Sequence, residues 1–176
     1  ISGLFPLFAY RSAERINQHV KTWLTNAKEP FFMFINYMDV HDYCSKHSQG
    51  LVDRLRQKPK NSNPSQRYGH SLNYLDNKLG DLIKLLESHG LIDRTALIVT
   101  SDHGEMLGEH NLLGHRAGFP YNTLLHIPLV IRDPKSISED RIDISHMVSI
   151  KNIGSIIHHM IQGKPLLECI KTLPDW

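Results

Sequence analysis

The residues from Ser101 to His115, SDHGEMLGEHNLLGH, combine acidic side chains with histidines over a short stretch. They include three histidines and three glycines, with carboxylates at Asp102, Glu105 and Glu109. The stretch follows directly on an apolar run, TALIVT, which is typical of a strand. Carboxylates and imidazoles gathered at the end of a strand suit a divalent cation, or a site that binds a phosphate or sulfate ester.

Asp102 and His103 are adjacent where the backbone leaves the strand, so both side chains can turn toward one point. Gly104 then allows the backbone to approach a bulky ligand. A mixed carboxylate and imidazole pair suits zinc, manganese or calcium, provided that further ligands come from elsewhere. The nearby candidates for these further ligands are Asp39, His41, Glu105, Glu109, His110 and His115.

Each of these residues also has an ordinary structural explanation. An isolated Asp-His pair in a loop can be a cap beside a surface imidazole. Glu105 and Glu109 stand four residues apart with His110 beside them, so they can form a solvated helical turn. His41, which follows an apolar run, can be a packed and hydrogen-bonded histidine. The residues alone leave both explanations open.

The composition narrows the classes of partner. The chain has 176 residues and a formal net charge of +2, which gives no reason to expect a nucleic-acid or membrane partner. Its two cysteines, Cys44 and Cys169, indicate neither a disulfide framework nor a CxxC metal site. The first residues, ISGLFPLFAY, lack a basic leader and are too short to span a bilayer, so no signal peptide or transmembrane segment is expected here. The localisation stays open.

The elements that must position the candidate residues alternate between helix and strand. Apolar residues at helical spacing predict helices over residues 12–26, 66–89 and 149–161. Apolar runs predict strands over residues 31–38, 96–100 and 126–134. Such continuous apolar strands are typical of a parallel sheet covered on both faces. The sheet would place His41 and the Asp102-His103 pair at one edge, where open α/β sheets bind their ligands.

We therefore expect a single α/β unit over residues 1–176, with a mostly parallel sheet flanked by helices. Residues 44–65 are polar and basic and show no usable periodicity, so we expect a surface loop or an insertion there.

Three segments together resemble a known family. PFFMFINYMDVH, then YGHSLNYLDNKLGDLIKLLESHGLIDRTALIVTSDHGEMLGEHNLLGH, then LLHIPLVIRDP resemble the C-terminal part of the catalytic domain of sulfatases, within the alkaline phosphatase superfamily. The resemblance runs from Pro30 to about Ile161, in the family's order and spacing. It implies an alkaline-phosphatase-like α/β fold of which this chain holds part.

The resemblance also implies a mechanism. Sulfatases attack sulfur with a hydrated formylglycine made from cysteine or serine, while a divalent cation, usually calcium, holds the sulfate oxygens. Asp102 would be a metal ligand. His103 would stand where the family has Asn, or His in its phosphatase-like relatives, and would be the second metal ligand. His41 would contact the sulfate and donate a proton to the leaving alcohol.

The chain departs from the family pattern at two points. His115 stands where many sulfatases carry Lys, and it would act on the sulfate when protonated or else bind a metal. The family's nucleophile motif, Cys/Ser-x-Pro-x-Arg, does not occur, because Cys44 is followed by SKHS and Cys169 by IKTL. The paired aspartates of the metal site do not occur either. We therefore expect a fragment that is inactive alone and needs the N-terminal half of the domain as its partner.

Three functions remain open at this point. The first is a fragment of a sulfuric-ester hydrolase that acts on a sulfate ester with calcium. The second is a phosphodiesterase or phosphonate monoester hydrolase of the same superfamily, with zinc or manganese, which His103 and His115 favour. The third is a non-catalytic binding domain, which the missing nucleophile favours.

Overall fold

A computed structural model describes residues 11–44, 63–115, 118, 120–135, 142–145 and 147–173. The chain forms two compact units, Ile1–His89 and Gly90–Trp176. Most of the loop predicted over residues 44–65 lies outside the described residues. No helix in the described part of the chain is long and apolar enough to cross a membrane.

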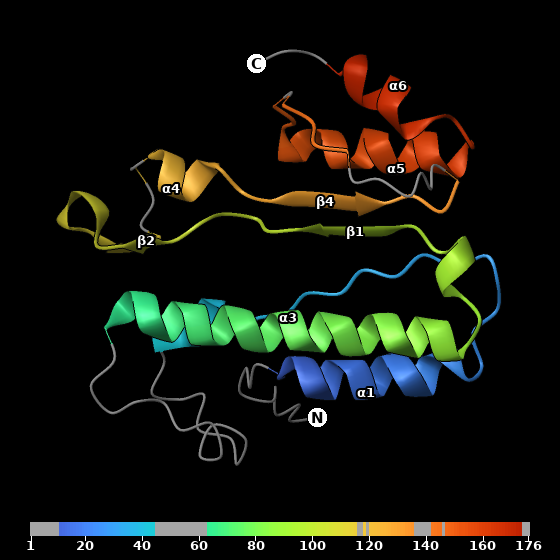
Figure 1. The fold of residues 1–176 in the computed structure, drawn as a ribbon, viewed down its shortest axis with the longest axis horizontal. Helices are drawn as coiled ribbons and strands as arrows, with labels where there is room; N and C mark the ends of the chain where they lie inside the picture. Colours follow the sequence, from blue (N-terminus) through green and yellow to red (C-terminus); the bar gives the residue numbers. More distant parts are fainter. Residues whose placement is uncertain are drawn as a thin grey trace, which may run out of the picture. The chain divides into compact units, whose positions relative to one another are not determined.

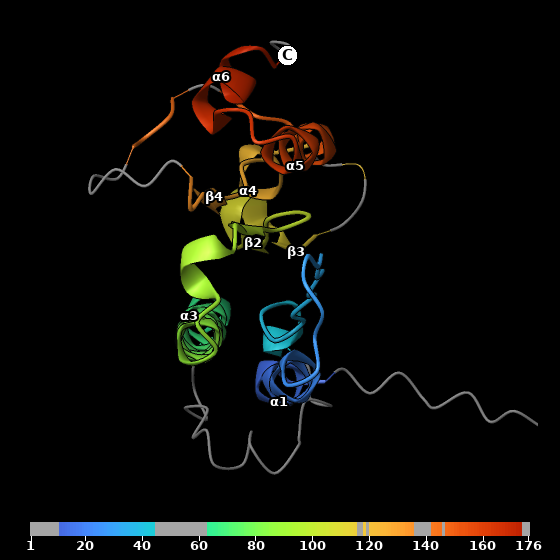
Figure 2. The same ribbon diagram turned by 90° about the vertical axis from the view of Figure 1, so that its right-hand side faces the viewer.

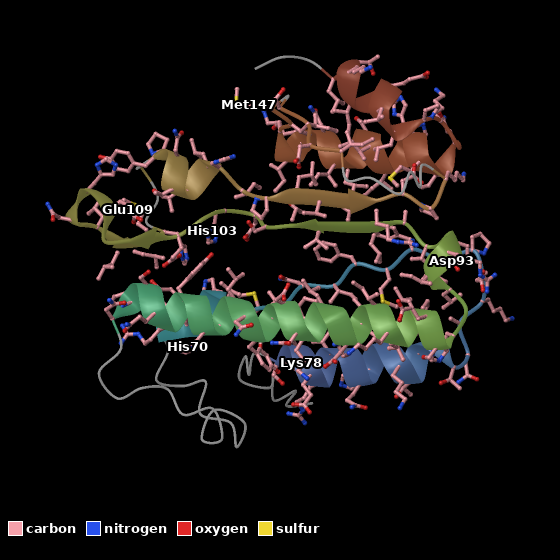
Figure 3. All side chains as sticks on the ribbon, viewed as in Figure 1. His70, Lys78, Asp93, His103, Glu109 and Met147 are labelled. Carbon is pink, nitrogen blue, oxygen red and sulfur yellow. The ribbon has the colours of Figure 1, made fainter. Side chains whose placement is uncertain are left out.

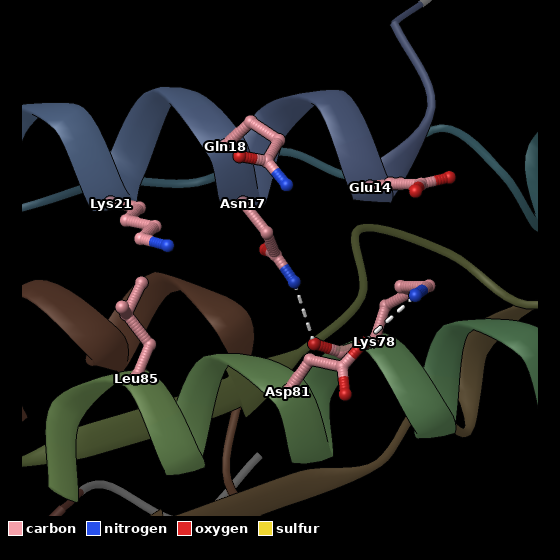
Figure 4. Close-up of a pocket in the computed structure, with 7 residues that line it drawn as sticks. All are labelled: Glu14, Asn17, Gln18, Lys21, Lys78, Asp81 and Leu85. Carbon is pink, nitrogen blue, oxygen red and sulfur yellow. Dashed lines mark hydrogen bonds and ion pairs between the residues drawn. The ribbon is translucent and has the colours of Figure 1, made fainter. Parts of the chain in front are cut away.

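The first unit is built on two helices, α1 (Ala13–Leu24) and α3 (Pro64–Ser88), which lie side by side (Figures 1 and 2). A hydrogen bond joins them, since the Asn17 side-chain amide donates to the carbonyl of Lys78 at 2.8 Å. Lys78 also pairs with Asp81 at 2.8 Å, and a shallow groove of about 300 Å³ runs along these residues (Figure 4). The groove has no histidine or cysteine in its lining, so we assign it no chemistry.

Helix α3 begins two residues before the predicted start because Asn63 forms a capping box with Gln66. The Asn63 side chain accepts from the backbone N–H of Gln66 at 2.9 Å, and the Gln66 side chain accepts from the backbone N–H of Asn63 at 3.1 Å. Pro64 at the first helical position loses no hydrogen bond there. Tyr68 of this helix packs edge-on against Tyr43 of η1 (His41–Cys44), with ring centroids 5.5 Å apart.

Residues 31–38 were predicted as a strand, but the structure assigns no strand there. The segment instead runs back along α1, with Phe31 edge-on to Trp23 at 5.1 Å and the Tyr37 hydroxyl donating to Asn17 at 2.6 Å. Its exposure alternates as in a strand, and Phe32 and Phe34 are 70% and 82% exposed. The segment therefore has the alternating exposure of a strand, but in the described structure it pairs with no neighbouring strand.

The second unit contains the two strand pairs of the described residues, and both are antiparallel. Strand β1 (Leu97–Thr100) follows the short helix η2 (Ile92–Arg94) and pairs with β4 (Leu129–Arg132), so that Ile98 lies opposite Ile131. The expectation of a mostly parallel sheet is therefore not met by these strands. The physical reason is that the described chain between them has a hairpin and one short turn of helix, rather than the long crossover that parallel strands need.

That hairpin is formed by β2 (Met106–Leu107) and β3 (Leu113–Gly114), with the turn η3 (Glu109–Asn111) between them. The one-turn helix α4 (Asn122–Leu125) follows and precedes β4. None of these four elements was predicted from the periodicity, because each has only two to four residues and so does not repeat an apolar pattern.

Two C-terminal helices cover one face of the β1–β4 pair (Figures 1 and 2). Helix α5 (Ile153–Ile161) follows η4 (Ile150–Asn152), and α6 (Leu166–Lys171) comes next. Elements η4 and α5 together agree with the helix predicted over 149–161, whereas α6 was not predicted. The buried residues of this core are Ile156, Leu166, Cys169 and Ile170, and they pack against Ile98, Leu129 and Ile131 of the strands.

We predict that Ile156→Ala lowers the free energy of unfolding by about 2–5 kcal/mol, because it leaves a cavity at a fully buried position. Ile161→Ala in the same helix is the matched control. That side chain is 75% exposed, so its loss should change stability by less than about 0.5 kcal/mol. Urea unfolding followed by circular dichroism measures both. Equal effects of the two substitutions would contradict this account of the core.

Candidate metal and ester-binding site

A hairpin brings Glu105 and His115 together, although ten residues separate them in the sequence. In this hairpin Met106 lies opposite Gly114. Glu105 precedes β2 and His115 follows β3, so the next step along the same antiparallel pair sets these two residues against each other. Their side chains meet there, because the His115 Nδ1 lies 2.7 Å from a Glu105 carboxylate oxygen.

His103 completes a group of three side chains with metal-ligating atoms. One such atom from each of His103, Glu105 and His115 lies within 4.8 Å of the other two. The rings of His103 and His115 are stacked with their centroids 4.3 Å apart. The Glu105 side chain is 10% exposed, whereas each histidine side chain is 36% exposed. The group therefore combines a nearly buried carboxylate with two imidazoles that solvent can reach.

The hydrogen bonds of the two histidines determine which ring nitrogen carries the proton. A carbonyl oxygen accepts only, so the His103 Nδ1 donates to the carbonyl of Gly104 at 2.8 Å. In the same way the His115 Nδ1 donates to the Glu105 carboxylate. Both histidines are thus held to the protein through Nδ1.

The loop that carries His103 is fixed by short backbone contacts. The Gly104 N–H donates to the carbonyl of Leu124 at 2.8 Å. The Ser101 hydroxyl donates to the carbonyl of His103 at 3.1 Å. A Cβ on Gly104 would lie 2.0 Å from the carbonyl oxygen of Thr123. Glycine is therefore required here because another backbone segment passes too close for any side chain.

Asp102, predicted as a metal ligand beside His103, lies outside the three-residue group. Its side chain is 86% exposed, and one carboxylate oxygen accepts from the backbone N–H of His103 at 3.0 Å. The same oxygen lies 3.8 Å from the His103 Nε2. The predicted pair is thus adjacent in space, and its role in metal binding stays a prediction.

Glu109 lies in the turn at the tip of the hairpin (Figure 3). His110 belongs to the same turn, η3, rather than to a helical turn with Glu105. His110 and Asn111 both adopt the left-handed conformation, with φ of 53° and 57°, and the His110 ring stacks on Tyr121 at 3.9 Å. The backbone N–H groups of Glu109 and Leu107 hold the pKa of the Glu109 carboxyl below its ordinary value. Glu109 and His110, which the sequence offered as candidate ligands, therefore both take part in interactions of the turn.

Glu105 is the residue whose importance the sequence reasoning missed. It was considered as a ligand but assigned to a solvated turn together with Glu109. A hairpin signal was present in MLGEHNLLG, because two short apolar pairs flank a glycine and polar turn residues. A hairpin prediction would have set Glu105 opposite His115.

His41 belongs to the first unit, where it is exposed at the start of η1. Just before it, an Asp39 carboxylate oxygen accepts from the backbone N–H of Ala13 at 2.8 Å and so stabilises the N-terminus of α1. Burial, together with the nearby Asp39 charge, raises the pKa of Tyr37 to about 12, so this phenol stays protonated at neutral pH. The predicted catalytic role of His41 stays a prediction.

Cys169 is a structural residue. Its side chain is 2% exposed in the core of the second unit, and burial raises the pKa of the thiol. A buried neutral thiol is a poor nucleophile, which agrees with the absence of the nucleophile motif around it.

The comparison with protein families identifies the family of the chain. The family model described as Sulfatase matches residues 2–160. The chain belongs to the sulfatase family. This membership implies the alkaline-phosphatase-like α/β fold and agrees with the resemblance of the three sequence segments. Enzymes of the sulfatase family are metalloenzymes, and the group formed by His103, Glu105 and His115 is a possible metal site in this member.

Relatives of known name match parts of the chain. The N-acetylglucosamine-6-O-sulfatase of Bacteroides thetaiotaomicron is 41% identical over 113 residues, which is 58% of this chain and 20% of that protein. The uncharacterized sulfatase YidJ of Escherichia coli is 30% identical over 156 residues, 70% of this chain and 31% of that protein. The multifunctional alkaline phosphatase superfamily protein PehA of Trinickia caryophylli is 46% identical over 59 residues, 34% of this chain and 11% of that protein. The chain thus spans less than a third of each of these relatives.

We predict that Gly104→Ala destabilises this sulfatase-family chain by about 1–3 kcal/mol, because the added methyl group must displace the backbone at Thr123. Gly154→Ala is the matched control, since a Cβ there meets nothing within 4 Å and the position is helical. The control should stabilise the protein by about 0.5 kcal/mol. Thermal unfolding of both variants checks the prediction. A neutral Gly104→Ala would show that the loop is not fixed in this way.

Proposed function

We propose that this chain supplies one part of the active site of a sulfatase-type ester hydrolase. In this proposal it forms the C-terminal part of the catalytic domain and acts on a sulfate ester. The rest of the domain, including the nucleophile and the paired aspartates, comes from another part of the protein. The absence of Cys/Ser-x-Pro-x-Arg from these 176 residues supports this division. So does the small share of each relative that the chain matches.

The observation that carries the proposal is the group of His103, Glu105 and His115 in a chain that the sulfatase family matches over residues 2–160. Two histidines and a carboxylate are suited to bind an anionic ester or a cation and to move a proton. The groove between α1 and α3 offers no such group of side chains. Its lining contains no histidine, and two of its charged residues, Lys78 and Asp81, pair with each other.

Two histidines have distinct roles in this proposal. His115, held by Glu105 through Nδ1, presents its Nε2 to the ester, where it binds an oxygen when protonated and accepts a proton when neutral. His41 donates the proton that the leaving alcohol requires. Imidazoles are suited to both tasks because they change charge near neutral pH.

The side chains of the site fit a divalent cation, and both kinds of ion expected from the sequence find a matching donor there. A divalent cation in such a site polarises the ester oxygens as a Lewis acid. Calcium takes oxygen ligands, and Asp102 offers oxygen at this loop. Imidazole nitrogens from His103 and His115 are better matched to zinc or manganese. We therefore propose Asp102 and His103 as metal ligands, with calcium for a sulfate ester and zinc or manganese for a phosphodiester.

A second function has an observation in its favour, namely the stacked pair of His103 and His115. Two imidazoles beside a carboxylate are typical ligands of the metals used by phosphodiesterases and phosphonate monoester hydrolases. The similarity to PehA, whose name places it among multifunctional members of the alkaline phosphatase superfamily, agrees with this alternative. The same groups could then act on a phosphate ester instead of a sulfate ester.

We predict that the purified 176-residue chain hydrolyses neither an aryl sulfate nor an aryl phosphodiester, whereas the longer protein that contains it hydrolyses one of them. In the longer protein, His115→Ala and His41→Ala should each lower kcat/KM by about 100-fold or more, the range expected for a general acid or base. His158→Ala, which removes an exposed histidine of α5, is the matched control and should leave kcat/KM unchanged.

Both substrates are assayed with each variant, so the preferred ester distinguishes the sulfatase from the phosphodiesterase. Turnover by the 176-residue chain that His41→Ala abolishes would contradict the division of the active site. Full activity of the His115→Ala variant would contradict the role of the hairpin site.

A further inference from the structure

We propose that Tyr121 is a positioning residue for the candidate site. Its ring stacks on His110 at the tip of the β2–β3 hairpin. In this proposal the stack keeps Glu105 and His115 in contact at the base of the hairpin. The effect on catalysis rests on the role proposed above for His115, whereas the effect on the hairpin can be measured without any ester substrate.

The tip of this hairpin has a backbone that needs support. His110 and Asn111 are consecutive residues with φ of 53° and 57°, a left-handed conformation that residues with a side chain rarely adopt. The strands on either side have two residues each, and so short a pair is marginally stable by itself. A contact from outside the hairpin is therefore expected to stabilise the turn.

Tyr121 provides such a contact. The rings of His110 and Tyr121 are nearly parallel, with an angle of 15° between their planes and 3.9 Å between their centroids. Tyr121 is itself held in place at the start of α4, because its carbonyl accepts from the backbone N–H groups of Leu124 at 2.8 Å and Leu125 at 3.1 Å. The turn therefore packs against a ring whose backbone is fixed.

Helix α4 and its N-cap contact the loop of the site at two places, and Figures 1 and 2 show α4 beside the hairpin. At the first place the Leu124 carbonyl accepts from the backbone N–H of Gly104 at 2.8 Å, directly before Glu105. At the second place the Tyr121 ring contacts His110, which lies between Glu105 and His115 in the sequence. The second contact therefore bears on how these two residues lie relative to each other.

The two strands of the hairpin are anchored unequally, and this makes the stack important for His115. Met106 of β2 is 1% exposed, whereas Leu113 of β3 is 54% exposed. Strand β3, which leads to His115, therefore depends more on the turn that precedes it. Loss of the stack should let β3 separate from β2, so that the 2.7 Å contact between Glu105 and His115 forms less often.

The first experiment follows the His115 ring in the 176-residue chain by nuclear magnetic resonance. Long-range proton–nitrogen correlation shows which ring nitrogen carries the proton, at about pH 8, where histidines are ordinarily neutral. His115→Gln identifies the signal by its loss. We expect a ring protonated at Nδ1, as its hydrogen bond to Glu105 requires. Tyr121→Ala should change this signal to the average of two exchanging tautomers.

Further variants test whether the stack is responsible. Tyr121→Phe keeps the ring and should keep the signal of the unmodified chain. His110→Asn removes the other ring but retains a residue type that tolerates the left-handed backbone, so it should act like Tyr121→Ala. The double variant should change the signal no more than either single variant, because both remove the same contact. Leu125→Ala is the matched control, since that side chain is 62% exposed in the same helix and its loss should change nothing.

The second experiment measures kcat and KM in the longer protein that contains this chain. Tyr121→Ala should lower kcat/KM about 10–100-fold, mainly through kcat, because a catalytic group displaced by about 1 Å can cost that much. Tyr121→Phe should retain the activity of the unmodified protein. A changed His115 signal without loss of activity would support positioning by Tyr121 and contradict the catalytic role of His115, so the two proposals fail separately.

Three outcomes would overturn the positioning role. Tyr121→Ala could leave the His115 ring protonated at Nδ1, or Tyr121→Phe could act like Tyr121→Ala. Additive effects of Tyr121→Ala and His110→Asn in the double variant would show that the two rings act separately. Circular dichroism shows whether each variant folds. If Tyr121→Ala does not fold, His110→Asn decides the question, because His110 is exposed at the tip of the hairpin.

Discussion

The antiparallel pairing of Met106 with Gly114 is the interaction on which the candidate site depends. It fixes which residues of the loop face each other, and a shift by one residue would move Glu105 away from His115. Two features hold this register. The Met106 side chain is 1% exposed and anchors β2, while Gly114 has a φ of 88° that a residue with a side chain rarely adopts. The arrangement of the group therefore rests on packing and backbone geometry outside the three side chains that form it.

The β1–β4 pair positions the other part of the site and has two different faces. The face with Ile98 and Ile131 is covered by α5 and α6. The opposite face carries Val99 and Val130, which lie opposite each other and are 40% and 62% exposed. An isolated two-stranded ribbon is marginally stable and needs a covered apolar face. One face meets this need within the second unit, and the other presents an apolar surface on that unit.

The sequence predicted the long elements well and the short ones poorly, for a physical reason. Helices α1 and α3 and strands β1 and β4 repeat their apolar pattern often enough to be recognised. The hairpin strands have two residues each and show no period, and the pairing of strands depends on contacts distant in the sequence. The parallel sheet was inferred from apolar strands alone, which cannot reveal their direction. His103 and His115 were therefore found by residue type, whereas Glu105 required knowledge of the pairing.

The replacement of a lysine by His115 is best understood together with Glu105. A lysine carries a fixed positive charge at neutral pH and has no lone pair to offer in that form. A histidine that donates its Nδ1 proton to a carboxylate can hold a proton on Nε2 or present a lone pair there. The same residue can thus bind an anionic oxygen in one state and a cation in the other. In the sulfatase-type role proposed for this chain, His115 would bind an anionic oxygen, whereas in the phosphodiesterase alternative it would bind a cation.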